Sequence, residues 1–184
     1  MAGRETLTED LMKVQTLRDS SALDDRSTAI IACAFLEDAL EEAIAVRLPG
    51  LTVFLRKKMF SPSAGSAGNM SAKIDLAEAL RAVGPNAATD LRTMATIRNK
   101  FAHTMRADTF DAEQVRGLAE NLRRVEEVGA ENPSMPSGDQ MIRTSLMEWD
   151  DRSRRGRFVY TAVVLTTSLY NASIDAGFGL CGAD

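Results

Sequence analysis

The sequence has few of the residues on which several classes of protein depend. Of its 184 residues, 5% are aromatic, two are cysteines and one, His103, is a histidine. Cys33 and Cys181 fit no metal-ligand or disulfide spacing, so we expect a reducing compartment and a cytoplasmic location. A single histidine excludes a zinc site built on paired histidines. Glycine-rich loops for phosphates or dinucleotides do not occur, and we expect neither a metal nor a cofactor.

The sequence also lacks the long apolar runs that form signal peptides or membrane-spanning segments. Its first residues do not form the apolar run of a signal peptide. The stretch from Phe158 to Ile174 contains no charged residue, but it is short for a membrane span and includes several threonines and serines. The apolar positions keep a helical period, so we predict a buried core or interface helix and no membrane partner.

An excess of positive charge is absent too, which argues against direct binding to DNA. The net charge is −4, and basic residues cluster only at Arg56–Lys58, Arg123–Arg124 and Arg152–Arg157. Clusters of this size are usual at solvated helix ends, and no aromatic residues interleave with them. No helix-turn-helix pattern is recognisable, so we expect no sequence-specific contact with DNA.

What the chain does contain favours helices. Apolar residues make up 45% and charged residues 26%, and alanine, leucine and methionine are plentiful. The length suits one domain with its own core. We predict an all-α, single-domain bundle of about six or seven helices. We divide it into an N-terminal helical extension (1–19), a helical domain (20–175) and a C-terminal tail (176–184).

The longest early helix is predicted from Asp24 to Leu48, before Pro49-Gly50. Its apolar positions at helical spacing are Ile30, Cys33, Ala34, Leu36, Leu40 and Ile44. Glu37 falls on the same face, where a carboxylate is unfavourable unless a cation or hydrogen bonds compensate it. We further predict a short helix with a basic end over 51–60, a flexible loop over 61–69, and helices capped by Ser71 and Asn86.

The helix after Asn86 carries the most informative polar residues. Arg98 lies in line with the apolar residues Leu91 and Phe101, so we expect it to be partly buried and paired with a carboxylate. Glu37 is the first candidate for that partner. His103, near the end of the same helix, would stabilise the helix terminus, where a cation is favoured. In this interpretation Arg98 and His103 are structural and neither is catalytic.

Several segments resemble the mannitol operon repressor (MltR-type) family in order and spacing. They are Leu36-Glu37, residues 70–77 (Met-Ser-Ala-Lys-Ile-Asp-Leu-Ala), Asp90-Leu91, residues 97–103 (Ile-Arg-Asn-Lys-Phe-Ala-His), Phe110 and Arg157-Phe158. The resemblance covers roughly residues 20–175, and the chain departs from the family at Met70, where an aromatic is usual. It implies an all-helical protein that regulates transcription through partner proteins, without a DNA-binding module. The signature positions are Glu37, Ser71, Lys73, Asp90, Arg98 and His103.

The segment 98–103 is also similar to the Arg-x4-His motif of HEPN-type helical proteins. That resemblance implies a metal-independent ribonuclease in which two subunits bring Arg98 and His103 together at a dimer interface. His103 would act as general acid or base, Arg98 would stabilise charge on the phosphorus, and Asn99 would orient the phosphate. Two interpretations therefore stay open: an interaction protein, expected to be a homodimer formed through an apolar helix face, and a ribonuclease that binds RNA.

Overall fold

A computed structural model describes residues 23–104, 107–122 and 153–181 of the chain. These residues form six helices and no strand: α2 (Asp25–Ala45), α3 (Val53–Met59), α4 (Met70–Ala79), α5 (Pro85–His103), α6 (Glu113–Glu120) and α9 (Arg154–Cys181). The predicted all-α bundle of six or seven helices is confirmed. The predicted N-terminal extension (1–19) lies outside the described residues.

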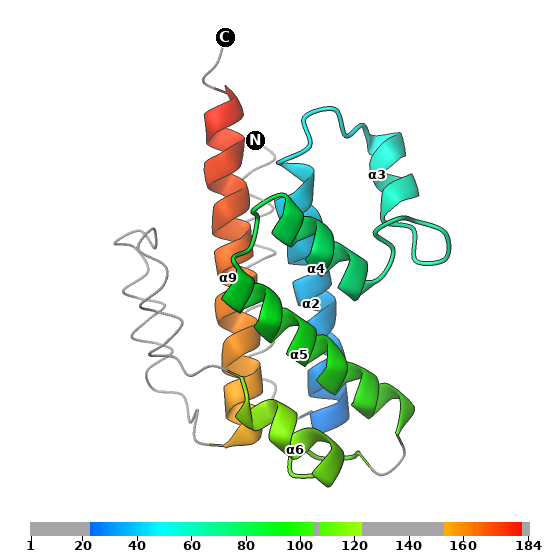
Figure 1. Ribbon diagram of the computed structural model, residues 1–184, viewed down its shortest axis with the longest axis vertical. Helices are drawn as coiled ribbons and strands as arrows, with labels where there is room; N and C mark the ends of the chain where they lie inside the picture. Colours follow the sequence, from blue (N-terminus) through cyan, green and yellow to red (C-terminus); the bar gives the residue numbers. More distant parts are fainter. Residues whose placement is uncertain (1–22, 105–106, 123–152, 182–184) are drawn as a thin grey trace.

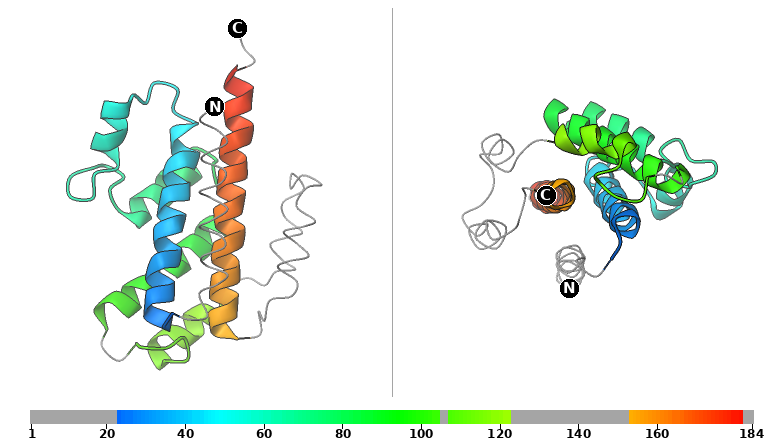
Figure 2. Two further views of the ribbon diagram at one scale, coloured as in Figure 1. Left: turned by 180° about the vertical axis from the view of Figure 1, so that it is seen from behind. Right: turned by 90° about the horizontal axis from the view of Figure 1, so that it is seen from below.

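The helices form two layers around one core. The long helices α2 and α9 lie side by side, and α4, α5 and α6 cover one side of this pair (Figures 1 and 2). The side chains between the layers belong to a single hydrophobic cluster that draws on α2, α4, α5, α6 and α9. Helix α3 stands apart at the edge of the bundle, and none of its residues is buried (Figure 1).

Helix α2 begins at a cap that the sequence encodes. The side chain of Asp24 accepts a hydrogen bond from the Ser27 backbone N–H at 2.8 Å, and this bond holds the pKa of Asp24 below its ordinary value.

The predicted buried face of α2 is wrong at two positions, since Ile30 is 43% exposed and Ala34 is also exposed. The buried stripe is completed by small residues instead: Ala29, Ala32, Ala39 and Ala43. They let neighbouring helices pack closely without large side chains.

The burial of helix α9 explains why the sequence of this helix contains so few charged residues. Every residue from Phe158 to Thr166 is buried, so no face of this stretch meets solvent. A helix enclosed on all sides is apolar all round. The predicted helix over 158–174 is confirmed, and it continues to Cys181, past the boundary predicted at residue 175. In the part of the chain that the structure describes, no helix has the length and apolarity needed to cross a membrane.

The starts of α4 and α5 differ from the prediction. Asn69, not Ser71, caps α4, because its side chain accepts from the Ala72 N–H at 2.9 Å. Ser71 is the second residue of the helix and is exposed. Helix α5 begins at Pro85, so Asn86 lies inside it and is not its cap. Proline occupies the first helical position readily, because its missing N–H would have no partner there.

The loop between α3 and α4, which its composition predicts to be flexible, contains hydrogen bonds between its own backbone groups. Gly65 N donates to Ser61 O at 2.8 Å, and Ala67 N donates to Met59 O at 2.9 Å. A Cβ atom at Gly68 would lie 2.2 Å from the carbonyl oxygen of Ser61. The glycine is therefore required by the close approach of two backbone segments.

This geometry predicts opposite effects for two glycine substitutions. Gly68→Ala should lower the free energy of unfolding by about 1–3 kcal/mol, since the loop must shift. Gly117→Ala is the matched control: a Cβ there meets nothing within 4 Å, and alanine should stabilise α6 by about 0.5–1 kcal/mol. Urea unfolding of both variants measures the difference. Equal midpoints for the two variants would contradict the loop geometry.

Candidate functional site

Four charged side chains meet where α2, α4 and α5 come together, and we call them the polar network: Glu37, Glu41, Lys73 and Arg98. Lys73 Nζ lies 2.7 Å from Glu41 Oε1 and 3.2 Å from Glu37 Oε2. Arg98 Nη2 lies 2.8 Å from the other oxygen of Glu37, Oε1. Glu37 thus accepts from both cations, and the network joins α4 and α5 to α2, which comes much earlier in the sequence.

The side chains of the polar network are largely shielded from solvent. The side chain of Lys73 is 5% exposed, and those of the two glutamates are each 24% exposed. Two carboxylates face two cations, so the network is electrically balanced. A buried ammonium is strongly unfavourable without such partners. The arrangement fixes the positions of α4 and α5 against α2.

The structure brings together three of the predicted site residues: Glu37, Lys73 and Arg98. The partner expected for Arg98 from its position on the apolar stripe, Glu37, is the one found. The sequence reasoning missed Glu41. A signal for it was present, because Glu41 follows Glu37 by four residues and so lies on the same face of α2.

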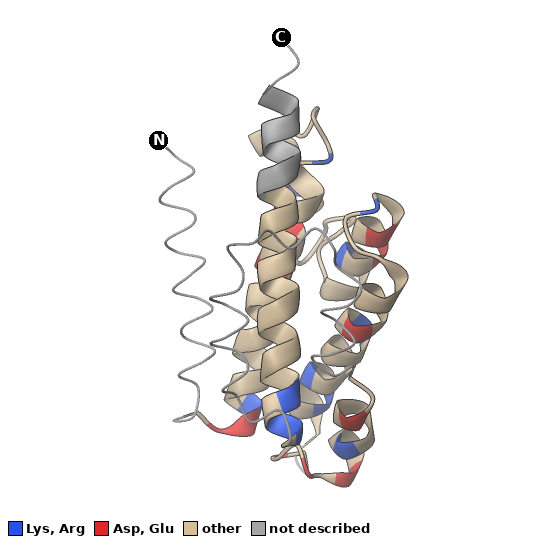
Figure 3. Cartoon of the chain, turned by 90° about the vertical axis from the view of Figure 1, so that its left-hand side faces the viewer, with Lys and Arg blue, Asp and Glu red and all other residues tan. Residues whose placement is uncertain are grey.

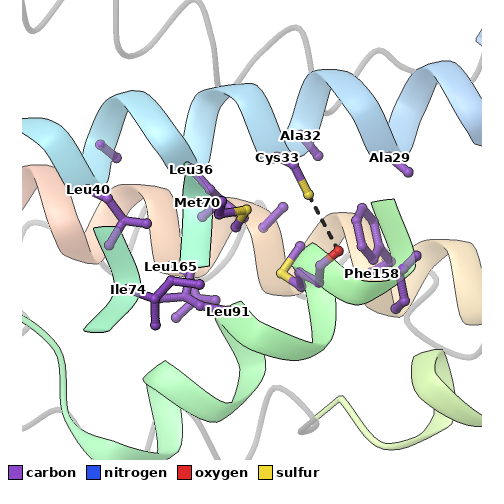
Figure 4. Packing of buried hydrophobic residues seen from close by; sticks show 14 of the residues in the cluster. Ala29, Ala32, Cys33, Leu36, Leu40, Met70, Ile74, Leu91, Phe158 and Leu165 are labelled. Carbon is purple, nitrogen blue, oxygen red and sulfur yellow. Dashed lines mark hydrogen bonds between the residues drawn. The ribbon is translucent and has the colours of Figure 1, made fainter. Parts of the chain in front are cut away.

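Cys33 lies beside the polar network but has no nucleophilic character. Its thiol donates to the Met94 carbonyl oxygen at 3.6 Å (Figure 4). Burial raises the pKa of Cys33 to about 12, although the nearby charge of Arg98 acts in the opposite direction. The thiol therefore stays protonated at neutral pH. Among the residues described, no three His, Cys, Asp or Glu side chains gather in a way that could hold a metal ion.

The other predicted residues of α5 lie elsewhere. Asn99 and His103 are both exposed, and His103 is the last residue of the helix. Arg98 and His103 are five residues apart, roughly 140° around a helix axis, so Arg98 reaches α2 while His103 faces solvent. The side chain of Asp90 is buried on α5, two turns before Arg98. One copy of the chain does not bring Arg98 and His103 to a common point.

The basic residues at the start of α9 are engaged within the fold. Arg154 pairs with Glu120 and Asp111, and Arg155 Nη1 lies 2.8 Å from Asp25 Oδ1. Figure 3 shows the charged residues of the described part of α9 gathered at its first turns. Arg123, Arg124 and Arg152 lie outside the described residues. Arg154 and Arg155 therefore bind the chain's own acidic groups, and Arg157 donates to the backbone carbonyl oxygen of Glu120 at 2.8 Å.

Helix α3 carries an exposed apolar surface that was not predicted from the sequence. Val53, Phe54 and Leu55 are 74%, 73% and 45% exposed, and we call them the apolar tip. Lys57 and Lys58 follow the tip in the same short helix and are also exposed. Contiguous exposed apolar side chains mark sites of interaction more often than single ones do. The short predicted helix over 51–60 is present as α3; Val53, Phe54 and Leu55 stay outside the core, whereas Phe60, just after the helix, is buried in it.

Comparison with known proteins gives no relative for this chain: it matches no family model, and no curated protein or solved structure is significantly similar to it.

Proposed function

We propose that the chain is a regulatory protein that acts in the control of transcription through protein–protein contact, without a DNA-binding module of its own. The observation that carries this proposal is the apolar tip of α3, an exposed apolar surface on an otherwise well-packed bundle. The resemblance of residues 20–175 to the mannitol operon repressor family supports the same role. The pairing of Arg154 and Arg155 with carboxylates supports it too, since these two cations are already neutralised within the fold.

The polar network argues against the ribonuclease interpretation. Arg98 would have to contact a phosphate, yet its Nη2 already donates to Glu37 at 2.8 Å. Releasing it would leave Glu37 with Lys73 alone and would remove the ion pair that links α5 to α2. We assign Arg98 a structural role, and we treat the exposed His103 as dispensable for function.

Two measurements test this proposal. In the native host, deleting the gene should change transcript levels, and wild type and His103→Gln should restore them equally, since no proton transfer is involved. Purified wild type should not cleave RNA in the absence of metal, and Arg98→Ala should unfold at a lower temperature. The proposal is wrong if wild type cleaves RNA and His103→Ala abolishes cleavage while keeping its melting temperature, since that result identifies a ribonuclease.

A further inference from the structure

We infer that the apolar tip and the two lysines beside it form a docking surface for an extended or helical segment of a partner protein that combines apolar and acidic side chains. This inference rests on the proposed function and names the chemistry of the partner. The surface consists of Val53, Phe54, Leu55, Lys57 and Lys58.

The apolar tip faces solvent because the contacts that attach α3 to the bundle lie on its other side and at its ends. Arg56 forms a bidentate pair with Glu42 of α2, with Nη1 to Oε2 at 3.2 Å and Nη2 to Oε1 at 2.5 Å. Thr52 caps the helix by accepting from Leu55 N at 3.3 Å, and Phe60, just after the helix, is buried. These contacts attach α3 to the bundle on its Arg56 side and leave the apolar tip in solvent.

The lysines lie on the same outward side as the apolar tip. In a helix, residues three and four apart are neighbours, so Lys57 lies beside Val53 and Phe54, and Lys58 lies beside Phe54 and Leu55. Arg56 projects on the opposite side, toward Glu42. Neither lysine has a partner among the described residues. Apolar contact with flanking carboxylates is therefore the chemistry that complements this face.

Two other occupants fit less well. Recognition of anionic lipid uses clusters of about four to eight cations, whereas α3 offers two that are unpaired, on a chain with a net charge of −4. A second copy docked through the same face would place both pairs of lysines in one interface, because a two-fold contact repeats the same patch. Like charges placed together oppose that contact.

A phage-displayed library of random peptides of about twelve residues, selected on the full-length protein, tests the inference. Wild type should enrich peptides that combine leucine, isoleucine or phenylalanine with aspartate or glutamate. The double variant Lys57→Glu/Lys58→Glu should lose those peptides and enrich basic ones. Phe54→Ser should weaken the selected peptides by at least about tenfold in fluorescence anisotropy. Arg116→Glu, a charge reversal at an exposed residue of α6, is the matched control and should bind within about twofold of wild type.

Three outcomes would overturn the inference. The first is that the charge-reversed variant selects the same peptides as wild type. The second is that wild type, and not Phe54→Ser, sediments with phosphatidylserine vesicles at physiological salt, which would make the partner a membrane. The third is that light scattering finds a dimer that Phe54→Ser converts to a monomer, which would make it a second copy. Peptide selection does not depend on RNA cleavage or transcript levels, so this inference and the proposed function can fail separately.

Discussion

Replacing Phe110 by alanine is expected to lower the free energy of unfolding by about 3–5 kcal/mol, the largest effect of any single change considered. The Phe110 ring lies 5.0 Å from the ring of Phe101 and 5.0 Å from that of Phe158, measured between centroids. Its side chain thereby joins α5 and α9 through the segment that precedes α6. Truncation leaves a cavity between α5 and α9 and removes two aromatic contacts.

Urea unfolding of Phe110→Ala and Phe110→Leu measures this contribution. Leucine retains most of the volume and the apolar character, so its loss should stay near about 1–2 kcal/mol. A natural domain has a total stability of about 5–15 kcal/mol, and the alanine variant should therefore be partly unfolded at moderate temperature. If both variants lose the same small amount, the ring cluster is not part of the core in solution.

The second large effect is expected for Lys73→Ala. Its ammonium group is the main counter-charge for Glu41 and shares Glu37 with Arg98. Without it, two half-buried carboxylates face a single arginine. Removing one partner of a buried ion pair costs about 3–5 kcal/mol, and we expect about 3 kcal/mol here because the glutamates keep some contact with water. Thermal and urea unfolding measure the loss.

Arg92→Ala is the matched control for Lys73→Ala. Arg92 pairs with Asp75 and Glu78 at 2.7 Å and 2.6 Å, and it also joins α5 to α4. These pairs are exposed to solvent, so their loss should cost less than about 1 kcal/mol. A double-mutant cycle between Lys73 and Glu41 then isolates the pairwise term, which we expect to exceed about 1 kcal/mol. A coupling near zero would show that Lys73 contributes only through the packing of its methylene groups.

The helices themselves could be predicted from the sequence, because periodicity and caps are local signals. The uncharged stretch that begins at Phe158 was correctly predicted as a buried helix, and Asp24 was correctly placed at the start of α2. The face of α2 was harder to predict. Alanines give little hydrophobic signal, so the exposed Ile30 was taken for a core residue while Ala29 and Ala32 fill that position.

The candidate site was predicted in part, for a physical reason. Glu37 and Arg98 each lie on an apolar helix face, so each had to find a buried partner, and opposite charge made the pair the simplest solution. The contact of Lys73 with Glu41 depends on how α4 crosses α2, which no local pattern encodes. The exposure of Phe54 also depends on tertiary structure. The local sequence of an apolar helical turn does not show whether another helix covers it.

The pairing of α2 with α9 has a consequence for how the chain acquires its fold. The helix that packs along α2, α9, comes from residues 154–181, more than a hundred residues later in the sequence. Contacts of such high sequence separation slow folding, because a long loop must close before they form. During synthesis, the side of α2 that packs against α9 has no partner until residues 154–181 leave the ribosome. Until then the side of α2 that α9 covers remains exposed, and this is the interval in which a chaperone would have most to protect.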